Sequence, residues 1–258
     1  MRLPRRLRHG EEATLVEHLD ELRSRIITAL VTIILCAIVA FVFQHRILHW
    51  LSAPLPLDKL TQGLTTFGVA EPFLVTFKVS LWVGFGAAFP IILWQVWSFF
   101  APAVAERTQR VIAYCVAFAA GLLVAGVAFG YYVVLPKALS FLTHYNDKEF
   151  NNLIRATDYY NFVLLVLVGV GVVFELPVFM LSLVRIGVLS SYRLRHTRRI
   201  GYFLVAVVGV ALPGIDPVTT TLETVPLFVL YEGSIWLAVL MERYWARREV
   251  LPLESTPL

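Results

Sequence analysis

Residues 26–43 read IITALVTIILCAIVAFVF, eighteen consecutive residues without a charged side chain. A bilayer core about 30 Å thick requires about 20 apolar helical residues, so this stretch predicts a membrane-spanning helix. Comparable stretches recur along the chain, which has 258 residues, a mean hydropathy of +0.73 and only 16% charged residues. Soluble domains of this length have about a quarter of their residues charged. The sequence therefore predicts an all-α, multi-pass integral membrane protein.

We predict six transmembrane helices, with the last two spans short. In chain order they occupy residues 26–43, 72–100, 111–135, 159–184, 200–212 and 225–241. The thirteen residues of the fifth segment reach only about 20 Å, so that segment either thins the bilayer or fails to cross it. A re-entrant hairpin over residues 200–241 is therefore an open alternative. Both arrangements leave the two chain ends on the same side of the membrane.

The distribution of basic residues predicts which side that is. With six spans, sixteen Lys and Arg residues fall in the segments that share a side with the N-terminus, five fall in the opposite segments, and Lys78 lies inside the second span. Because cytoplasmic loops carry the excess of Lys and Arg, we predict an N-in, C-in orientation. Residues 1–13 and 244–258 are expected to be flexible cytoplasmic ends of a membrane domain covering 14–243.

An amphipathic segment precedes the first span and reads TLVEHLDELRSR over residues 14–25. Thr14 and Glu17 have the spacing of a capping box, and leucines follow at helical spacing, so a helix is predicted to begin here. Glu21 would lie near the inner membrane surface, where a carboxylate can pair bidentately with a guanidinium. An ordinary amphipathic anchor is the alternative interpretation.

Two further features carry polar groups at positions where function is plausible. Near the end of the second span, Gln95 lies among aromatic residues typical of the membrane interface, and Glu106 follows in the next loop. Both could contact an incoming peptide. Glu175 lies ten residues before Arg185, about 15 Å from the inner end of the fourth span, and Pro177 could kink the helix beside it. An ionisable group at that depth is a functional candidate, although a glutamate that only holds helices together is the alternative.

The sequence does not indicate an enzyme or a cofactor. No HExxH, glycine-rich phosphate loop or G-x-S-x-G motif is present, and the six histidines lack metal-ligand spacing. Cys36 and Cys115 lie in separate apolar runs and are expected to be packing residues. Asp216, Glu223 and Glu232, around the sixth span, are weaker candidates because a short span places them nearer water.

A series of short motifs resembles the TatC family of twin-arginine protein translocation. They are HLDELRSR at 18–25, SAPL at 52–55, EPF at 71–73, QVWSF at 95–99, FELP at 174–177, PGID at 213–216 and LYE at 230–232. These motifs follow the family's order from about residue 14 to residue 243.

The resemblance implies a non-enzymatic core receptor in the bacterial cytoplasmic (inner) membrane that exports folded proteins. Signal peptides with two adjacent arginines would bind its cytoplasmic face. Single-span TatA/TatB-type partners would assemble on it within a larger complex, and the proton-motive force would drive transport. The resemblance also implies a concave, glove-like arrangement of the helices, with Glu175 on its inner face, and short fifth and sixth spans.

The resemblance further implies the site residues. The family's first signal-peptide carboxylate corresponds to Glu21, with Arg23 and Gln95 nearby. Its second carboxylate follows the loop proline by six residues, which is Thr108 here, whereas Glu106 lies two residues earlier. Either Glu106 replaces that residue through a local shift, or the second contact is weaker in this chain. The partner-contact region corresponds to Asp216, Thr219, Thr220 and Thr221.

A different functional class also remains open at this point. A proton-coupled small-molecule transporter would use Glu175 as its carrier group. Solute uptake by the purified protein in vesicles would discriminate it from a receptor.

Overall fold

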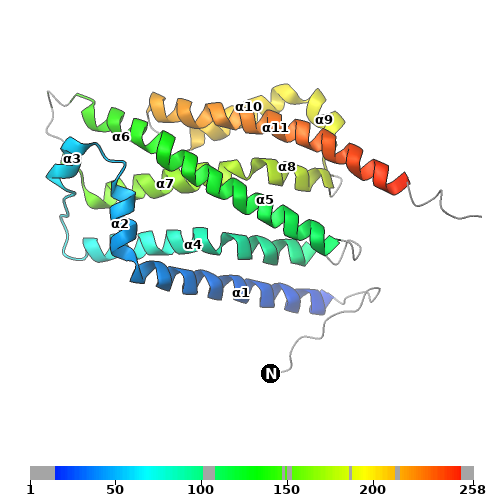
Figure 1. The fold of residues 1–258 in the computed structure, drawn as a ribbon, viewed down its shortest axis with the longest axis horizontal. Coiled ribbons are helices and arrows are strands. Elements are labelled where there is room, and N and C mark those ends of the chain that lie inside the picture. Colours follow the sequence, from blue (N-terminus) through cyan, green and yellow to red (C-terminus); the bar gives the residue numbers. More distant parts are fainter. Residues whose placement is uncertain are drawn as a thin grey trace, which may run out of the picture. The chain divides into compact units, whose positions relative to one another are not determined.

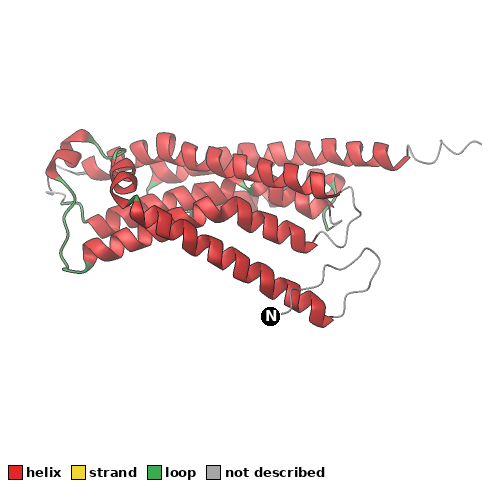
Figure 2. Cartoon of the chain, turned by 60° about the horizontal axis from the view of Figure 1, so that its bottom comes forward, coloured by secondary structure: helices red, strands yellow, loops and turns green. Residues whose placement is uncertain are grey.

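The computed structural model describes residues 15–100, 108–146, 149, 153–185, 188–212 and 216–250, with the side chains of these residues except 15–18, 62, 97, 100, 108–114 and 244–250. Every regular element in those ranges is helical (Figure 2), which confirms the predicted all-α class. The elements are α1 Leu15–Val42, α2 Gln44–Ser52, α3 Leu57–Gln62, α4 Glu71–Phe100, α5 Thr108–Phe129, the π-helical turn η2 Gly130–Val134, α6 Leu135–His144, α7 Ala156–Phe174, α8 Leu176–Arg185, α9 Ser191–His196, α10 Arg198–Ala211 and α11 Pro217–Val250.

Five segments of the described chain are long and apolar enough to cross a membrane. They are Leu19–Val42, Glu71–Val96, Cys115–His144, Ala156–Arg185 and Pro217–Arg243. The predicted fifth span corresponds to α10, whose 14 residues extend about 21 Å. A sixth crossing and the N-in, C-in orientation therefore stay predictions.

The last span is longer than the sequence suggested. We predicted a short segment over 225–241, but the candidate span covers 27 residues. The polar residues that flank the apolar run are helical too, because the backbone hydrogen bonds of a helix do not depend on side-chain polarity. A helix of this length does not fit the re-entrant hairpin.

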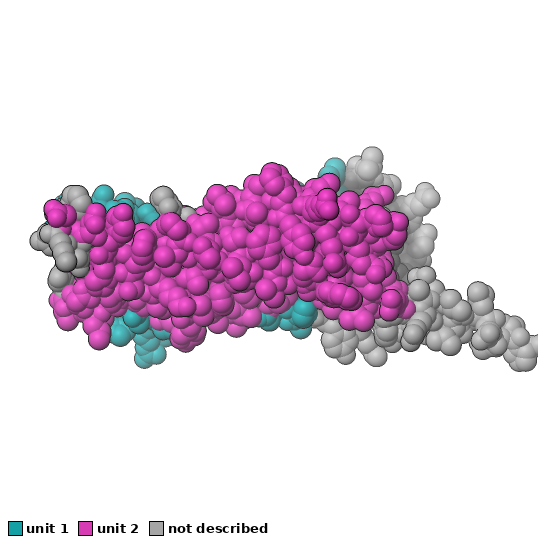
Figure 3. Space-filling view, turned by 90° about the horizontal axis from the view of Figure 1, so that it is seen from above, with its two compact units in different colours: residues 1–53, 62–121, 153–164 teal, residues 54–61, 122–152, 165–258 magenta. Residues whose placement is uncertain are grey.

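The chain divides into two compact units (Figure 3). The first contains residues 1–53, 62–121 and 153–164, and the second contains residues 54–61, 122–152 and 165–258. The concave, glove-like arrangement concerns the whole chain and stays a prediction.

In the first unit, α1 and α4 lie side by side (Figure 1) at a very close approach. A Cβ atom built on Gly84 would lie 2.5 Å from the backbone N and Cα of Ala37. Small residues let membrane helices approach this closely. The other side of α1 is apolar and exposed, as at Leu35, which is 58% exposed. Such a surface is suited to lipid rather than to water.

The same unit also fixes the short helix α2. The hydroxyl of Tyr159, at the start of α7, donates to the carbonyl of Leu51 at 2.8 Å. Tyr160 donates to the carbonyl of Leu48 at 3.2 Å. The two tyrosines therefore anchor α2.

The second unit has its own apolar core. It is formed by Val173, Val184, Leu194, Val205, Leu227, Tyr231, Ile235 and Ala238. A second close approach joins α5 to α7, because a Cβ on Gly126 would lie 2.8 Å from the side chain of Phe174. Helix α11 packs against α8, α9 and α10 around this core.

The chain ends are only partly described. Residues 1–13 lie outside the described residues. Helix α11 continues to Val250, and residues 251–258 lie outside as well. The predicted flexibility of both ends stays a prediction.

Candidate functional site

Glu21 occupies the first turns of α1 and shares its carboxylate with Arg25 of the same helix. The Arg25 Nε donates to Glu21 Oε1 at 3.1 Å, and Nη2 contacts the same oxygen. Residues four apart lie on one face of a helix, so the sequence itself places this pair. Glu21 and Arg25 are both partly buried, whereas Arg23 is exposed.

Arg25 also joins α1 to α4. Its Nη1 lies 3.5 Å from the side-chain oxygen of Gln95, near the far end of α4. Gln95 was predicted to belong to the signal-peptide site, and the structure brings it to the same guanidinium as Glu21. Both hydrogen bonds from Arg25 go to Oε1 of Glu21. Oε2 has no partner among the described side chains, so it can accept a further hydrogen bond. This group of Glu21, Arg25 and Gln95 is hereafter called the inner triad.

Two residues of the predicted signal-peptide site are not placed beside the inner triad. Glu106 lies outside the described residues. Thr108 is the first residue of α5, and its side chain is not among those described. The choice between Glu106 and a weaker second contact therefore stays open.

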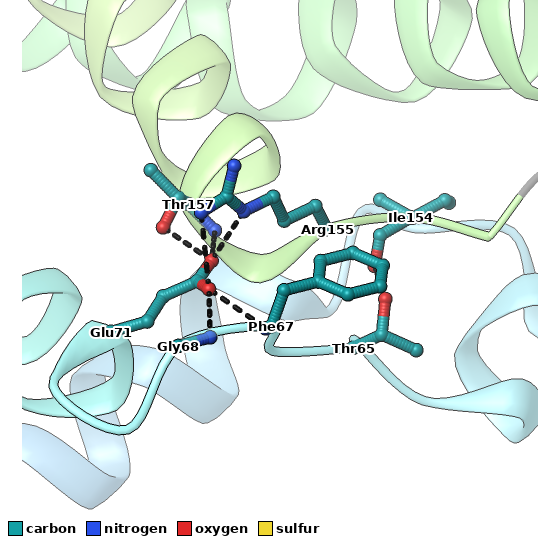
Figure 4. A network of polar contacts seen from close by, with 7 residues as sticks. All are labelled: Thr65, Phe67, Gly68, Glu71, Ile154, Arg155 and Thr157. Atoms are coloured by element: carbon teal, nitrogen blue, oxygen red, sulfur yellow. Dashed lines mark hydrogen bonds and ion pairs between the residues drawn. The ribbon is translucent and has the colours of Figure 1, made fainter.

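A larger polar network lies at the opposite end of α4 and was not predicted (Figure 4). Glu71 begins α4 and is only 6% exposed. Its Oε1 accepts hydrogen bonds from Arg155 Nε at 2.8 Å and from Thr157 Oγ1 at 2.6 Å. Its Oε2 accepts from the backbone N–H groups of Phe67 at 2.9 Å and Gly68 at 3.2 Å. A single carboxylate thus binds both segments that precede α4 and α7.

The backbone reinforces the same junction. Thr65 N donates to the Ile154 carbonyl at 2.9 Å, and Ala156 N donates to the Thr65 carbonyl at 2.8 Å. The Arg155 guanidinium lies 5.8 Å from the centre of the Phe67 ring. The hydrogen bond to Glu71 raises the pKa of Arg155 above its ordinary value. A glutamate at a helix start was the available sequence signal, but nothing in the sequence identified Arg155 as its partner.

Glu175 lies where the fourth candidate span changes from α7 to α8. Its N–H donates to Val172 at 3.1 Å, one residue short of helical spacing, and its carbonyl accepts from Phe179 at 3.0 Å. Pro177 lacks an N–H, which explains the local break. Among the described residues no partner is found for the buried Oε1 of Glu175. The side chain is therefore available to a group outside this chain or to a proton.

Glu223 is a second buried carboxyl group of the second unit, and we predicted it to be a weaker candidate than Glu175. Glu223 of α11 is 2% exposed, and both of its oxygens lack hydrogen-bond partners within the described part of the chain. The assumption of a short sixth span placed it near water. The helix is longer than assumed, and its packing within the unit encloses Glu223.

The predicted partner-contact residues divide into buried and exposed members. Asp216 caps α11 by accepting from Thr219 N at 2.8 Å and from Thr219 Oγ1 at 2.5 Å. Both residues are buried. Thr221 is exposed, and its hydroxyl donates to the Pro217 carbonyl at 2.6 Å. Thr220 is partly buried.

Helices α10 and α11 are tied by Glu232, the third residue of the LYE motif. It accepts a hydrogen bond from the Tyr202 hydroxyl and lies 3.5 Å from Arg198 Nη2.

No group of three or more His, Cys, Asp or Glu side chains in the described residues is arranged to hold a metal ion.

Comparison with known proteins finds similarity along almost the whole chain. Residues 17–226 match the family model described as Sec-independent protein translocase protein (TatC). The chain is 34% identical over 239 residues to Sec-independent protein translocase protein TatCd of Bacillus subtilis, covering 93% of this chain and 97% of that protein. It is 33% identical over 228 residues to TatC of Escherichia coli K12, covering 87% of each. Its fold matches a crystal structure described as the twin-arginine translocase receptor TatC, with a TM-score of 0.73, 32% identity and coverage of 86% of this chain and 98% of that one.

Proposed function

Because this chain belongs to the TatC family, the non-enzymatic receptor subunits of the Sec-independent protein translocase, we propose that it captures the paired arginines of twin-arginine signal peptides at its inner triad. Its multi-pass character and its place in the bacterial cytoplasmic membrane follow from the same membership and from the five apolar helices. A small-molecule transporter built on Glu175 is not favoured by that membership.

The observation that carries the proposal is the state of Glu21. A guanidinium of the chain itself already contacts its carboxylate, so the site has the geometry and charge that an arginine requires. An incoming arginine can bind Oε2 or displace Arg25 from Oε1. Gln95 then offers its side-chain oxygen to the displaced or the incoming guanidinium. Exposed ion pairs contribute only about 0–1 kcal/mol, so partial burial and apolar contacts of the peptide must add to the affinity.

We further propose that the inner triad faces the cytoplasm. This orientation agrees with the excess of basic residues on the N-terminal side and makes α10 a short fifth span. Glu106, which follows α4 in the sequence, is the proposed second acceptor. Arg23 lies two residues after Glu21, and Thr108 lies two residues after Glu106.

For the partners we propose that single-span TatA/TatB-type proteins contact the start of α11 at Thr220 and Thr221. Thr221 is the exposed member of that region, whereas Asp216 and Thr219 support it from inside. We propose that Glu175, whose Oε1 has no hydrogen-bond partner among the described residues, contacts the apolar part of the signal peptide or binds a proton during transport driven by the proton-motive force.

Site-specific photocrosslinking tests the receptor site directly. A twin-arginine signal peptide with a photoreactive residue beside its arginine pair should crosslink to the wild-type protein, and a peptide with two lysines in their place should not. Glu21→Gln should lose the crosslink, whereas Asp20→Asn, a change at the exposed neighbour, is the matched control and should keep it. If correctly inserted Glu21→Gln keeps the arginine-dependent crosslink, Glu21 is not the acceptor.

A further inference from the structure

Lys78 is a charged residue inside a candidate membrane span, seven residues after Glu71 on α4. That spacing is about 10 Å along the helix axis. The side chain is exposed, so the ammonium is not enclosed by this chain. An ammonium within a bilayer is costly unless it is paired or reaches the headgroup region. Lys78 therefore needs a polar environment that the described residues only partly provide.

Asn161 of α7 supplies one part of that environment. Lys78 Nζ donates to Asn161 Oδ1 at 2.7 Å. Because that oxygen accepts from the ammonium, the amide nitrogen of Asn161 remains as a second donor. Two hydrogens of the ammonium also remain free of partners among the described residues. The pair thus presents several N–H donors and a positive charge, which is the chemistry that binds a phosphate oxygen.

The direction of both side chains points to the headgroup region. Side chains of a helix lean toward its N-terminus, and both α4 and α7 begin at the end where Glu71 binds Arg155 and Thr157. A lysine stem reaches several ångströms in that direction and lifts the charge toward the membrane surface. A lipid phosphate at that surface is within reach, whereas a group at the membrane centre is not.

An apolar surface lies next to Lys78 and Asn161, on the side toward the C-terminal end of α4. Leu81 and Trp82, three and four residues after Lys78, share its face of α4 and are 41% and 37% exposed. Acyl chains attached to a phosphate at Lys78 would run along these side chains toward the membrane centre. We propose that Lys78 and Asn161 form a binding site for the phosphate of a membrane phospholipid, with its acyl chains on Leu81 and Trp82.

Native mass spectrometry of the purified protein, extracted in mild detergent from membranes containing phosphatidylglycerol, tests the proposal. Lys78→Met should lower the fraction of protein that retains phospholipid by roughly fivefold, as expected for one headgroup contact of about 1 kcal/mol. Lys78→Arg keeps the cation and should retain the lipid. Asn161→Leu should lower retention as well, and it tests the site if Lys78→Met does not fold.

Lys137 provides the matched control. It is an exposed lysine of α6 and has no partner among the described residues. It lies seven residues from His144, which ends its helix, just as Lys78 lies seven residues from Glu71, which begins α4. Lys137→Met should leave lipid retention unchanged. Equal retention by wild type and Lys78→Met, or equal losses in the Lys78 and Lys137 variants, would overturn the proposal. A loss of associated protein subunits in Lys78→Met, without a loss of lipid, would assign the lysine to a protein carboxylate and overturn it too.

Thermal shift measurements in detergent separate the two sources of phosphate. Phosphatidylglycerol should raise the melting temperature of the wild type more than that of Lys78→Met. Inorganic phosphate and a diacylglycerol, which lacks phosphate, should raise neither. A shift with inorganic phosphate alone would show an ion site rather than a lipid site. The readout does not involve signal peptides, so it stands or fails independently of the function proposed for Glu21.

Discussion

Arg155 places its Nε 2.8 Å from the Oε1 of Glu71, a residue 84 positions earlier in the chain. The carboxylate at the start of α4 and the guanidinium before α7 thereby join the two connecting segments that precede these helices. The hydroxyl of Thr157 and the backbone N–H groups of Phe67, Gly68 and Thr157 also donate to the same carboxylate. The junction is a feature of the first unit that depends on both segments being present.

The two charged members of this junction should be energetically coupled. Glu71→Gln and Arg155→Met should each lower the melting temperature of the purified protein, and the double variant should lower it by clearly less than the sum. Thr157→Val removes one hydrogen bond and should cost about 1 kcal/mol, less than either charged variant. Thermal unfolding followed by circular dichroism in detergent provides the measurement. Strictly additive effects would show that the pair contributes no coupling.

The carboxylate of Glu21 should be required for peptide binding but not for folding. Glu21→Ala should weaken binding of a twin-arginine peptide by about tenfold or more, as expected for the loss of a hydrogen bond to a charged group, and should abolish export while membrane insertion stays normal. Asp20→Asn changes the adjacent exposed carboxylate and should leave binding near wild type. Fluorescence anisotropy of a labelled signal peptide measures the affinity. Wild-type binding and export by Glu21→Ala would remove Glu21 from the site.

The guanidinium of Arg25 should compete with the peptide for the same oxygen. Arg25→Gln removes the internal charge from Glu21 Oε1, so a twin-arginine peptide should bind a few-fold more tightly, in line with about 1 kcal/mol for a partly exposed pair. The gain should disappear in the Glu21→Ala background. Weaker binding by Arg25→Gln alone would instead mean that Arg25 orients Glu21 for the peptide.

The packing of α1 on α4 should tolerate no side chain at residue 84. Gly84→Ala would place a methyl group 2.5 Å from the backbone of Ala37 and should destabilise the protein by about 1–3 kcal/mol. Gly86 has nothing within 4 Å of the position of a Cβ. Gly86→Ala should therefore be neutral or stabilising by up to about 1 kcal/mol, the helix-propensity difference. Equal melting temperatures for the two variants would show that α1 and α4 pack differently.

Much of the membrane organisation could be predicted from local sequence. The apolar run at 26–43 and the later ones, except that at 200–212, lie in segments of spanning length, and residues 15–25 of the amphipathic segment form the start of α1. The i to i+4 spacing of Glu21 and Arg25 also follows from the sequence, because residues four apart share a helix face. The interruption of the fourth span at Glu175 was foreseeable because Pro177 cannot complete the hydrogen-bond ladder.

The length of the last helix could not be predicted from apolarity. Hydropathy shows where a bilayer is favourable, but it does not show where a helix ends. Polar turns at both ends of residues 225–241 therefore looked like loops although α11 extends from Pro217 to Val250. The same error made Glu223 look solvated, whereas it is 2% exposed.

By itself the sequence determined the class of the protein, because the transfer of long apolar runs into a bilayer is a property of each segment alone. Its ordered motifs also determined the family. The tertiary structure alone decided which distant side chains meet: Glu71 with Arg155, Arg25 with Gln95, and Lys78 with Asn161. Each of these contacts spans at least 70 residues of chain. Their formation depends on how helices pack against one another, and helix packing is set by close approaches such as Gly84 on Ala37 rather than by the local sequence around either partner.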